Sequence, residues 1–250
     1  MRPMSVSPRT PRNHEVAPLT PEEIVARILY RDALILVIDK PPGLPVHLGP
    51  GGGATLEQSF EALRFGLPRP PALAHRLDRD TSGCLALGRN RAGLQKLGEL
   101  FASGAAQKTY WAVVSGTPSE AAGTITLPLK KRSDDRRSWR MMVADDGQPA
   151  ITDYVVRGAA GGLSWLELSP RTGRTHQLRV HCAAIGCPIL GDWVYGPREQ
   201  RPEQGWGTTM HLHARALVLP FYPRKPAISV EAPPPPHMGQ ALADCGYQPA

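Results

Sequence analysis

One short segment of the chain concentrates side chains that can act as nucleophiles or as general acids and bases. Residues 74–83 read Ala-His-Arg-Leu-Asp-Arg-Asp-Thr-Ser-Gly, with two carboxylates, two arginines, a histidine and two hydroxyls. Carboxylates and imidazoles commonly fill these catalytic roles. Asp and Thr-Ser-Gly sequences also form ordinary turns through side-chain to backbone hydrogen bonds. Composition alone therefore leaves a catalytic loop and a structural turn both open.

A second cluster of functional side chains lies at residues 171–181, where a strand-like pattern changes to a helical one. It contains three arginines and two histidines. Free N–H groups at a helix start, together with a nearby arginine, can bind a carboxylate or a phosphate. His176 and His181 are five residues apart, about 140° around a helix, and so lack the same-face spacing of a metal site. We expect an anion-binding segment and no metal.

The elements that must position these clusters follow from hydrophobic periodicity and from capping and turn residues. Helices are expected at residues 20–28, 55–63, 91–101 and 175–185, and strands at residues 34–38, 110–115, 138–144, 151–157 and 163–169. Strands outnumber helices and often follow one another directly. This order predicts an α+β fold with a mixed, mainly antiparallel central sheet and flanking helices.

The chain has 250 residues, of which 41% are hydrophobic, enough for a sizeable core. Lys and Arg total 29 against 22 Asp and Glu, giving a net charge of +7, and the pI of about 9.5 favours polyanionic partners. Pro-rich composition predicts poorly packed tails at residues 1–18 and 233–250. The folded catalytic domain is then expected at residues 19–232.

Location and redox state are indicated by what the sequence lacks. The longest strongly apolar stretch, residues 33–38, is far shorter than the roughly 20 residues that cross a membrane. The basic N-terminal segment is not followed by the apolar core of a secretory signal. The four cysteines form no CxxC pair, so neither a zinc site nor a disulfide framework is indicated. We expect a cytoplasmic monomer with reduced thiols.

Several motifs of the chain together resemble one enzyme family, the RluA-like RNA pseudouridine synthases. Residues 75–83 resemble the family's HRLDxxTSG signature, residues 40–43 its KPxG segment, residues 108–116 its KxYxAxVxG strand and residues 173–181 its GRTHQLRVH helix start, and residues 188–192 and 212–214 also fit. The motifs occur in the family's order across about residues 34–219. About 33 residues precede the first expected strand, too few for an S4-type domain, so the chain resembles the shorter members.

The resemblance implies a mainly antiparallel sheet cut by a central RNA-binding cleft, and it implies roles for single residues. Asp78 matches the catalytic aspartate, Arg174 the arginine that pairs with it, and Tyr110 the tyrosine that stacks on the target base. Arg76 matches the residue that fills the space left by the flipped nucleotide. Leu178 matches an apolar residue of the pocket.

These roles fit the chemistry of uridine isomerisation. The bond from the sugar to N1 breaks, the uracil rotates, and C5 joins the sugar. A carboxylate such as Asp78 can trap the cleaved sugar or remove a proton from it, and the paired arginine favours the charged carboxylate. The base must leave the stack, and Tyr110 can recover part of that cost by stacking; a proton role for its hydroxyl stays open. Thr81 is a further expected substrate-binding residue. No metal, nucleotide or organic cofactor is required.

The basic segment at residues 130–140 contains six cations and a tryptophan, tempered by two aspartates. Such runs are commonly solvated surface. In an RNA enzyme, contacts to phosphate groups become the better interpretation. We therefore expect Arg132, Arg136 and Arg137 to contribute to RNA binding.

Other functions stay open from the sequence. A noncatalytic RNA-binding protein would share the basic surface but would have no need of the aspartate and arginine pair. An N-glycosidase would release free uracil. The expected substrate is ribosomal RNA, transfer RNA or both, with transfer RNA alone as the alternative.

Overall fold

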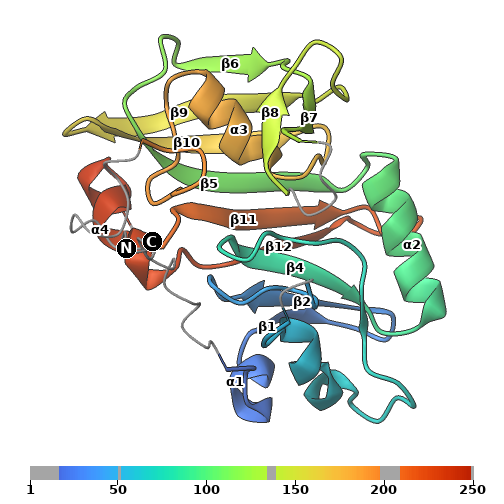
Figure 1. Cartoon of the computed structure of the whole chain (residues 1–250). Coiled ribbons are helices and arrows are strands. Elements are labelled where there is room, and N and C mark those ends of the chain that lie inside the picture. The colour runs from blue at the N-terminus through green and yellow to red at the C-terminus, as the bar shows by residue number, and fades with distance from the viewer. Residues whose placement is uncertain (1–16, 50–51, 134–138, 198–208, 249–250) are drawn as a thin grey trace, which may run out of the picture.

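The computed structural model describes residues 17–49, 52–133, 139–197 and 209–248. Its centre is one large sheet (Figure 1). The strands of this sheet are β1 (Ile28–Arg31), β2 (Ile35–Lys40), β3 (Ala72–Leu73), β4 (Ser82–Gly88), β5 (Gln107–Ser115), β6 (Ala122–Ile125), β9 (Thr152–Ala160), β10 (Leu163–Pro170), β11 (Leu212–Leu219) and β12 (Ile228–Glu231). The main path runs β1-β2-β4-β11-β5-β10-β9-β6, with β3 paired to β4 and β12 to β11.

Among the described strand pairs, β4 and β11 run parallel and the other pairs of this sheet run antiparallel. The helices are α1 (Pro21–Val25), the 3-10 helix η1 (Leu56–Leu63), α2 (Arg91–Ala102), α3 (Gln177–Ala184) and α4 (Pro236–Asp244). A separate hairpin joins β7 (Leu129–Lys131) to β8 (Met141–Val143). The predicted α+β class with a mainly antiparallel sheet is confirmed.

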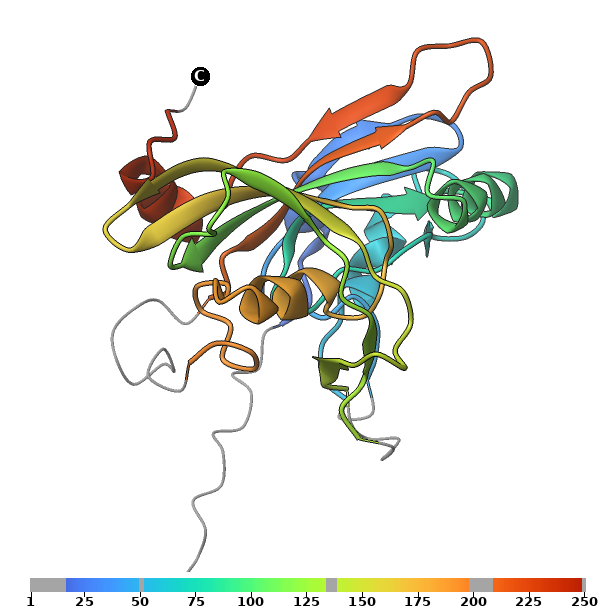
Figure 2. The ribbon, with the colours of Figure 1, turned by 90° about the horizontal axis from the view of Figure 1, so that it is seen from above.

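Helices cover both faces of the sheet because side chains alternate along each strand. On β5, Ala112 and Val114 pack with Leu178 and Cys182 of α3. The intervening Trp111 and Val113 pack with α4 instead. Figure 2 shows α3, η1 and the β7–β8 hairpin together on one side of the sheet, with α4 away from them.

The centre of the sheet joins the motif segments through a continuous register. Gly83 of β4 pairs with Ala214 of β11, which pairs with Tyr110 of β5. Gly83 has φ 103°, and a Cβ there would lie 2.3 Å from the Ala214 carbonyl oxygen. Only glycine fits so close an approach. The start of β4, directly after the Asp78 segment, is therefore held two strands away from Tyr110.

The C-terminal tail prediction is wrong. Residues 236–244 form α4, in which Met238 and Leu242 are fully buried against Trp111 and Val113 of β5. The prolines at residues 233–236 predicted a tail, but proline is well accepted in the first turn of a helix, and an amphipathic helix begins there. The predicted N-terminal tail falls largely on residues outside the description, so it stays a prediction.

Other differences concern strands that the sequence pattern did not reveal. β4, β11 and β12 were not predicted, and the element at residues 55–63 is a 3-10 helix. The described part of the chain contains no helix long and apolar enough to cross a membrane. Its four cysteines are free and buried.

Packing of α4 gives a direct stability prediction. Leu242→Ala should lower the free energy of unfolding by about 2–5 kcal/mol, the usual cost of a large cavity in a core. Gln240→Ala, on the exposed side of the same helix, should change it by less than about 0.5 kcal/mol. Urea unfolding measures both, and equal midpoints for the two variants would show that α4 does not pack on the sheet.

Candidate active site

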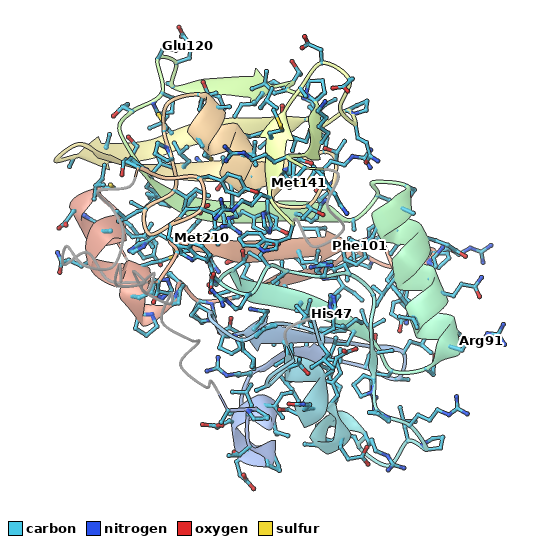
Figure 3. The ribbon with its side chains drawn as sticks, in the orientation of Figure 1. His47, Arg91, Phe101, Glu120, Met141 and Met210 are labelled. Carbon is cyan, nitrogen blue, oxygen red and sulfur yellow. The ribbon has the colours of Figure 1, made fainter. Side chains whose placement is uncertain are left out.

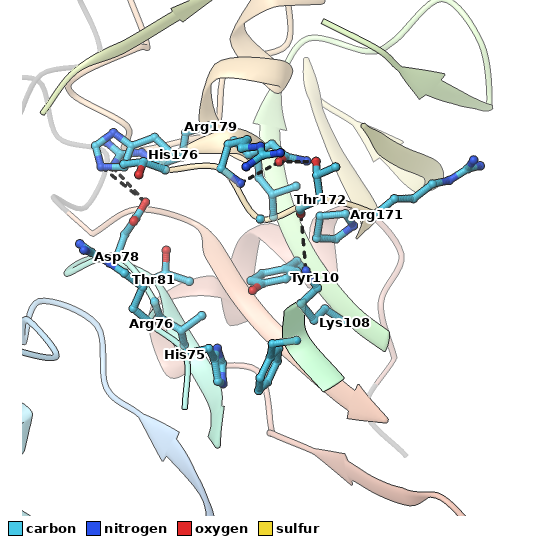
Figure 4. A pocket seen from close by; sticks show the side chains of 18 of the residues that line it. His75, Arg76, Asp78, Thr81, Lys108, Tyr110, Arg171, Thr172, His176 and Arg179 are labelled. Carbon is cyan, nitrogen blue, oxygen red and sulfur yellow. Dashed lines mark hydrogen bonds and ion pairs between the residues drawn. The ribbon is translucent and has the colours of Figure 1, made fainter. Parts of the chain in front are cut away.

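A cavity of about 590 Å³ opens where the motif segments meet (Figure 4). Its lining comes from residues 75–81 before β4, the end of α2, β5, and residues 170–179 at the start of α3. Asp78, Tyr110 and Leu178 all lie on this cavity. Arg76 and Arg174 line it as well, so the structure brings together all five residues that the resemblance assigned to the site.

The loop that carries Asp78 is held from below by a buried lysine. Lys40, at the end of β2, is fully buried. Its Nζ donates hydrogen bonds of 2.8 Å to the carbonyl oxygens of Pro41, Arg79 and Thr81. These three acceptors match the three donors of an ammonium group. Lys40 therefore fixes the backbone on the C-terminal side of Asp78.

Burial and the neighbouring charges shift the pKa of Lys40 in opposite directions. Burial lowers the pKa of Lys40 to about 7, while the charges of Asp80 and Asp78 act to raise it. The three hydrogen bonds of Lys40 to carbonyl oxygens, more than its charge, therefore explain a buried lysine at this position of the KPxG segment.

The cation that contacts Asp78 is Arg179 of α3. Its Nη1 lies 3.4 Å from Asp78 Oδ2. Its Nε and Nη2 donate to the two carboxylate oxygens of Asp192 at 2.7 and 2.8 Å. Asp192 is almost fully buried and also accepts hydrogen bonds from the backbone N–H groups of Val194 and Tyr195. Asp192 thus fixes the guanidinium in the plane that presents its remaining edge to Asp78.

Charge keeps this arginine protonated despite its burial. Burial lowers the pKa of Arg179, but the hydrogen bonds to Asp192 and the charges of Asp192 and Asp78 outweigh that effect, and the net shift is upward. The ring of Tyr195 also lies 5.1 Å from the guanidinium carbon. A cation in this position favours the charged form of a neighbouring carboxylate.

The expected pairing of Arg174 with Asp78 is therefore wrong. Arg174 is exposed, and its Nε donates to the carbonyl oxygen of Pro149 at 3.1 Å. The helix begins at Gln177 and not at residue 175, because His176 takes a left-handed conformation with φ 53°. Arg174 consequently lies in the turn before α3, on the rim of the cavity, while Arg179 faces Asp78.

His176 is a second neighbour of Asp78. Its Nε2 lies 3.8 Å from Asp78 Oδ2, and its Nδ1 is 2.8 Å from the hydroxyl of Tyr195. That hydroxyl accepts from the backbone N–H of Met141, so its own proton can be donated to Nδ1. This arrangement leaves the N–H of a neutral imidazole on Nε2, toward Asp78. Burial lowers the pKa of His176, against the charge of Asp78.

The opposite wall of the cavity is aromatic and apolar. Tyr110 packs against both of the large clusters that flank the middle of the sheet, and Leu178 is buried beside it. Burial, together with the charge of Asp78, raises the pKa of Tyr110. The phenol is accordingly neutral at physiological pH.

Two of the remaining predicted substrate residues line the cavity. Arg76 lines the cavity and is exposed, whereas Thr81 lines it but is buried. Thr81 also closes the turn after Asp78, since its N–H donates to the Asp78 carbonyl at 3.2 Å. Arg132 is exposed beside β7. Arg136 and Arg137 lie outside the described residues.

Several motif histidines have structural partners. The Nε2 of His75 accepts from the backbone N–H of Ala86, and its ring lies 4.2 Å from that of Phe101. His181 is buried between Thr152 and the Leu127 carbonyl. No group of three or more metal-ligating side chains occurs in the described part of the chain.

Sequence reasoning missed Arg179, Asp192, Tyr195 and Lys40 as parts of the site. Arg179 and His176 are three residues apart, the spacing of one helix face, and this could have indicated that they act together. The pairing of Arg179 with Asp192 spans a turn and a loop, and no local pattern indicates it.

Comparison with known proteins shows which family the chain belongs to. A family model described as RNA pseudouridylate synthase matches residues 34–184. A Zymomonas mobilis protein named as an uncharacterized RNA pseudouridine synthase is 41% identical over 225 residues, covering 90% of this chain and 99% of its own. A mitochondrial pseudouridylate synthase of Xenopus tropicalis is 33% identical, covering 85% and 78%.

Solved structures agree. Human RNA Pseudouridylate Synthase Domain Containing 4 superposes with a TM-score of 0.74 at 29% identity, covering 90% of this chain and 95% of its own. Human RNA Pseudouridylate Synthase Domain Containing 1 gives 0.71 at 31% identity, covering 87% and 86%. The chain belongs to the RNA pseudouridine synthase family. The RluA-like resemblance and the enzyme class expected from the sequence are confirmed.

The buried position of Asp192 gives a prediction with a matched control. Asp192→Asn should lower the free energy of unfolding by about 3–5 kcal/mol, because it leaves the buried Arg179 with a neutral partner. Asp153→Asn removes the charge from a similar two-bonded pair with Arg171 on the surface and should change stability little. Urea unfolding at neutral pH compares the two, and equal losses would contradict a special role for the buried pair.

Proposed function

We propose that the chain isomerises uridines in ribosomal RNA, transfer RNA or both, with Asp78 as the catalytic carboxylate. The observation that supports this most is the position of Asp78 in the cavity, 3.4 Å from Arg179 and on the same cavity as Tyr110. A carboxylate paired with a fixed cation, opposite an aromatic ring, suits a reaction at a nucleoside sugar.

The reaction is balanced within the nucleotide. The bond between C1′ and N1 breaks, and a bond between C1′ and C5 forms after the uracil has rotated. The proton on C5 leaves, and N1 gains one. Asp78 either bonds to C1′ of the cleaved sugar and later departs, or removes and returns the C2′ proton; both routes start from the ionised carboxylate. Because product and substrate contain the same atoms and no electrons are gained or lost, the route uses no cofactor.

Tyr110 is the stacking platform for the extruded uracil. Base extrusion costs a few kcal/mol, and aromatic stacking recovers about 1–3 kcal/mol of it. The raised pKa of Tyr110 makes its phenol a poor source of phenolate at neutral pH, which favours stacking over direct removal of the C5 proton. Leu178 bounds the apolar side of the same pocket.

The other residues act on the RNA around the target. Arg76 enters the space that the extruded nucleotide leaves. Thr81 keeps the turn after Asp78 closed and contributes to the cavity wall. Arg174, on the rim, binds phosphate instead of pairing with Asp78. Arg132, Arg136 and Arg137 bind phosphate groups of the RNA.

The cellular setting is part of the same proposal. A monomer acting in the cytoplasm fits the basic charge and the small size of the chain. Several relatives are named as mitochondrial, so the compartment and the choice between ribosomal and transfer RNA depend on mapping experiments. Transfer RNA alone is the alternative substrate.

Asp78→Asn tests the catalytic assignment. The amide preserves the shape of the side chain and removes its charge, so turnover should fall at least about 1,000-fold in rate, as when a covalent nucleophile is lost. Release of tritium from RNA labelled at uracil C5 measures the exchange. RNA affinity should stay near that of the parent, because it comes from phosphate contacts and stacking elsewhere.

Asp80→Asn is the matched control, since Asp80 pairs with its neighbour Arg79 and should be able to lose its charge with most turnover retained. Tritium release by Asp78→Asn at the parent's rate would contradict the role of Asp78. Free uracil among the products of the parent would show an N-glycosidase instead.

Neutralising Arg132, Arg136 and Arg137 together should weaken RNA binding and flatten its salt dependence. Each phosphate contact to single-stranded RNA contributes about 0.7 to the slope of log K against log salt concentration. Filter binding between 50 and 200 mM salt measures this slope. The control replaces the exposed Arg91 and Arg224 with glutamine, and an unchanged slope in the first variant would assign the segment to ordinary solvated surface.

A further inference from the structure

Two exposed tryptophans lie together just outside the cavity. Trp139 is 46% exposed and Trp193 is 37% exposed. Their ring centroids are 5.9 Å apart with an interplanar angle of 71°. Exposed aromatic side chains that cluster on a protein surface commonly mark a contact site. Neither residue has a role in the reaction described above.

The pair is held in place by the catalytic segment itself. The ring of Trp139 lies 5.4 Å from that of His176, whose Nε2 is 3.8 Å from Asp78. Trp193 follows directly after Asp192, the buried partner of Arg179. Figure 3 places Met141, at the start of β8, beside α3, where it packs near Val180. The tryptophan pair therefore adjoins the position of the target nucleotide.

The charge around the pair is positive. The guanidinium carbon of Arg140 lies 5.8 Å from the Trp139 ring. Lys131, Arg132 and Arg140 are all exposed at this end of the β7–β8 hairpin. An aromatic face bordered by cations suits a base and its phosphate, because bases of any sequence stack and the backbone is anionic.

We propose that Trp139 and Trp193 form a second base-binding site, which stacks an unpaired nucleotide next to the uridine held at Asp78. The inference rests on RNA being the substrate in the proposed function. Nucleotides beside an extruded base lose their own stacking partner, and an indole replaces it. The site selects targets whose neighbouring nucleotide can be unstacked, such as those in loops, and a base-paired neighbour is bound less well.

The test is a cycle of two proteins and two RNA probes. One probe is a five-residue oligouridylate with a dye at its 5′ end, and the other has abasic sites on both sides of the central uridine. Fluorescence anisotropy gives the affinities. Trp139→Ala should weaken binding of the intact probe about 5- to 150-fold, the loss expected for one base–aromatic stack. The parent should bind the abasic probe about as weakly as Trp139→Ala binds the intact probe. Trp139→Ala and the parent should have the same affinity for the abasic probe.

Three control proteins separate stacking from other effects. Trp139→Phe keeps an aromatic face and should retain most of the affinity, whereas Trp193→Ala should reproduce part of the loss. Phe65→Ala removes another exposed aromatic ring, which lies against Arg31 and outside the cavity lining. It should bind both probes like the parent.

Equal losses with both probes would overturn the proposal, and so would no loss with either probe. The face would be a self-association surface if Trp139→Ala converted a parent dimer to a monomer in sedimentation velocity while RNA affinity stayed unchanged, and that outcome also overturns it. Tritium release by the parent tests the proposed function separately. A parent that shows the binding cycle but releases no tritium would overturn the proposed reaction and leave the second base-binding site standing.

Discussion

The geometry of the site depends on one arginine shared by two carboxylates. Asp192 binds Arg179 through two short hydrogen bonds, and the third nitrogen reaches Asp78 at 3.4 Å. A flexible cation on the surface could meet Asp78 only at a cost in side-chain entropy. The side chain of Arg179 has already lost this conformational freedom, because it is buried and its guanidinium group is held by Asp192. Lys40 fixes the loop of Asp78 in the same way, from the other side.

The large sheet makes this pairing possible. Asp78 is 101 residues from Arg179 in sequence, and the register of β4, β11 and β5 brings their segments together. Gly83 permits the close contact between β4 and β11. The two helices on opposite faces of β5 then bury the strand on both sides. The proposed reaction, which needs a charged carboxylate in a partly buried site, thus depends on contacts distributed along the chain.

The sequence predicted those features of the fold that depend on residues close together in the chain. The residue types at the start of α1 predicted the capping box at Thr20. Hydrophobic periodicity predicted the apolar stripe of α2 and the alternation of β5. The motif segments pointed to Asp78, Tyr110 and Leu178. The start of α3 was predicted two residues too early because His176 adopts a left-handed conformation. As a result, Arg174 was predicted to pair with Asp78 in place of Arg179. α4 was missed because three prolines precede it and a fourth is its first residue. β11, Asp192 and Tyr195 act through long-range pairs, which no single-sequence pattern contains.

The activity to be tested is the conversion of specific uridines of cellular RNA to pseudouridine by this chain. Mapping pseudouridine at single-nucleotide resolution in total RNA tests it most directly, in cells that carry the gene and in cells that lack it. We expect one or more uridines, in ribosomal or transfer RNA, that are modified only when the gene is present and that have an unpaired neighbour. Identical maps from the two kinds of cell would contradict it.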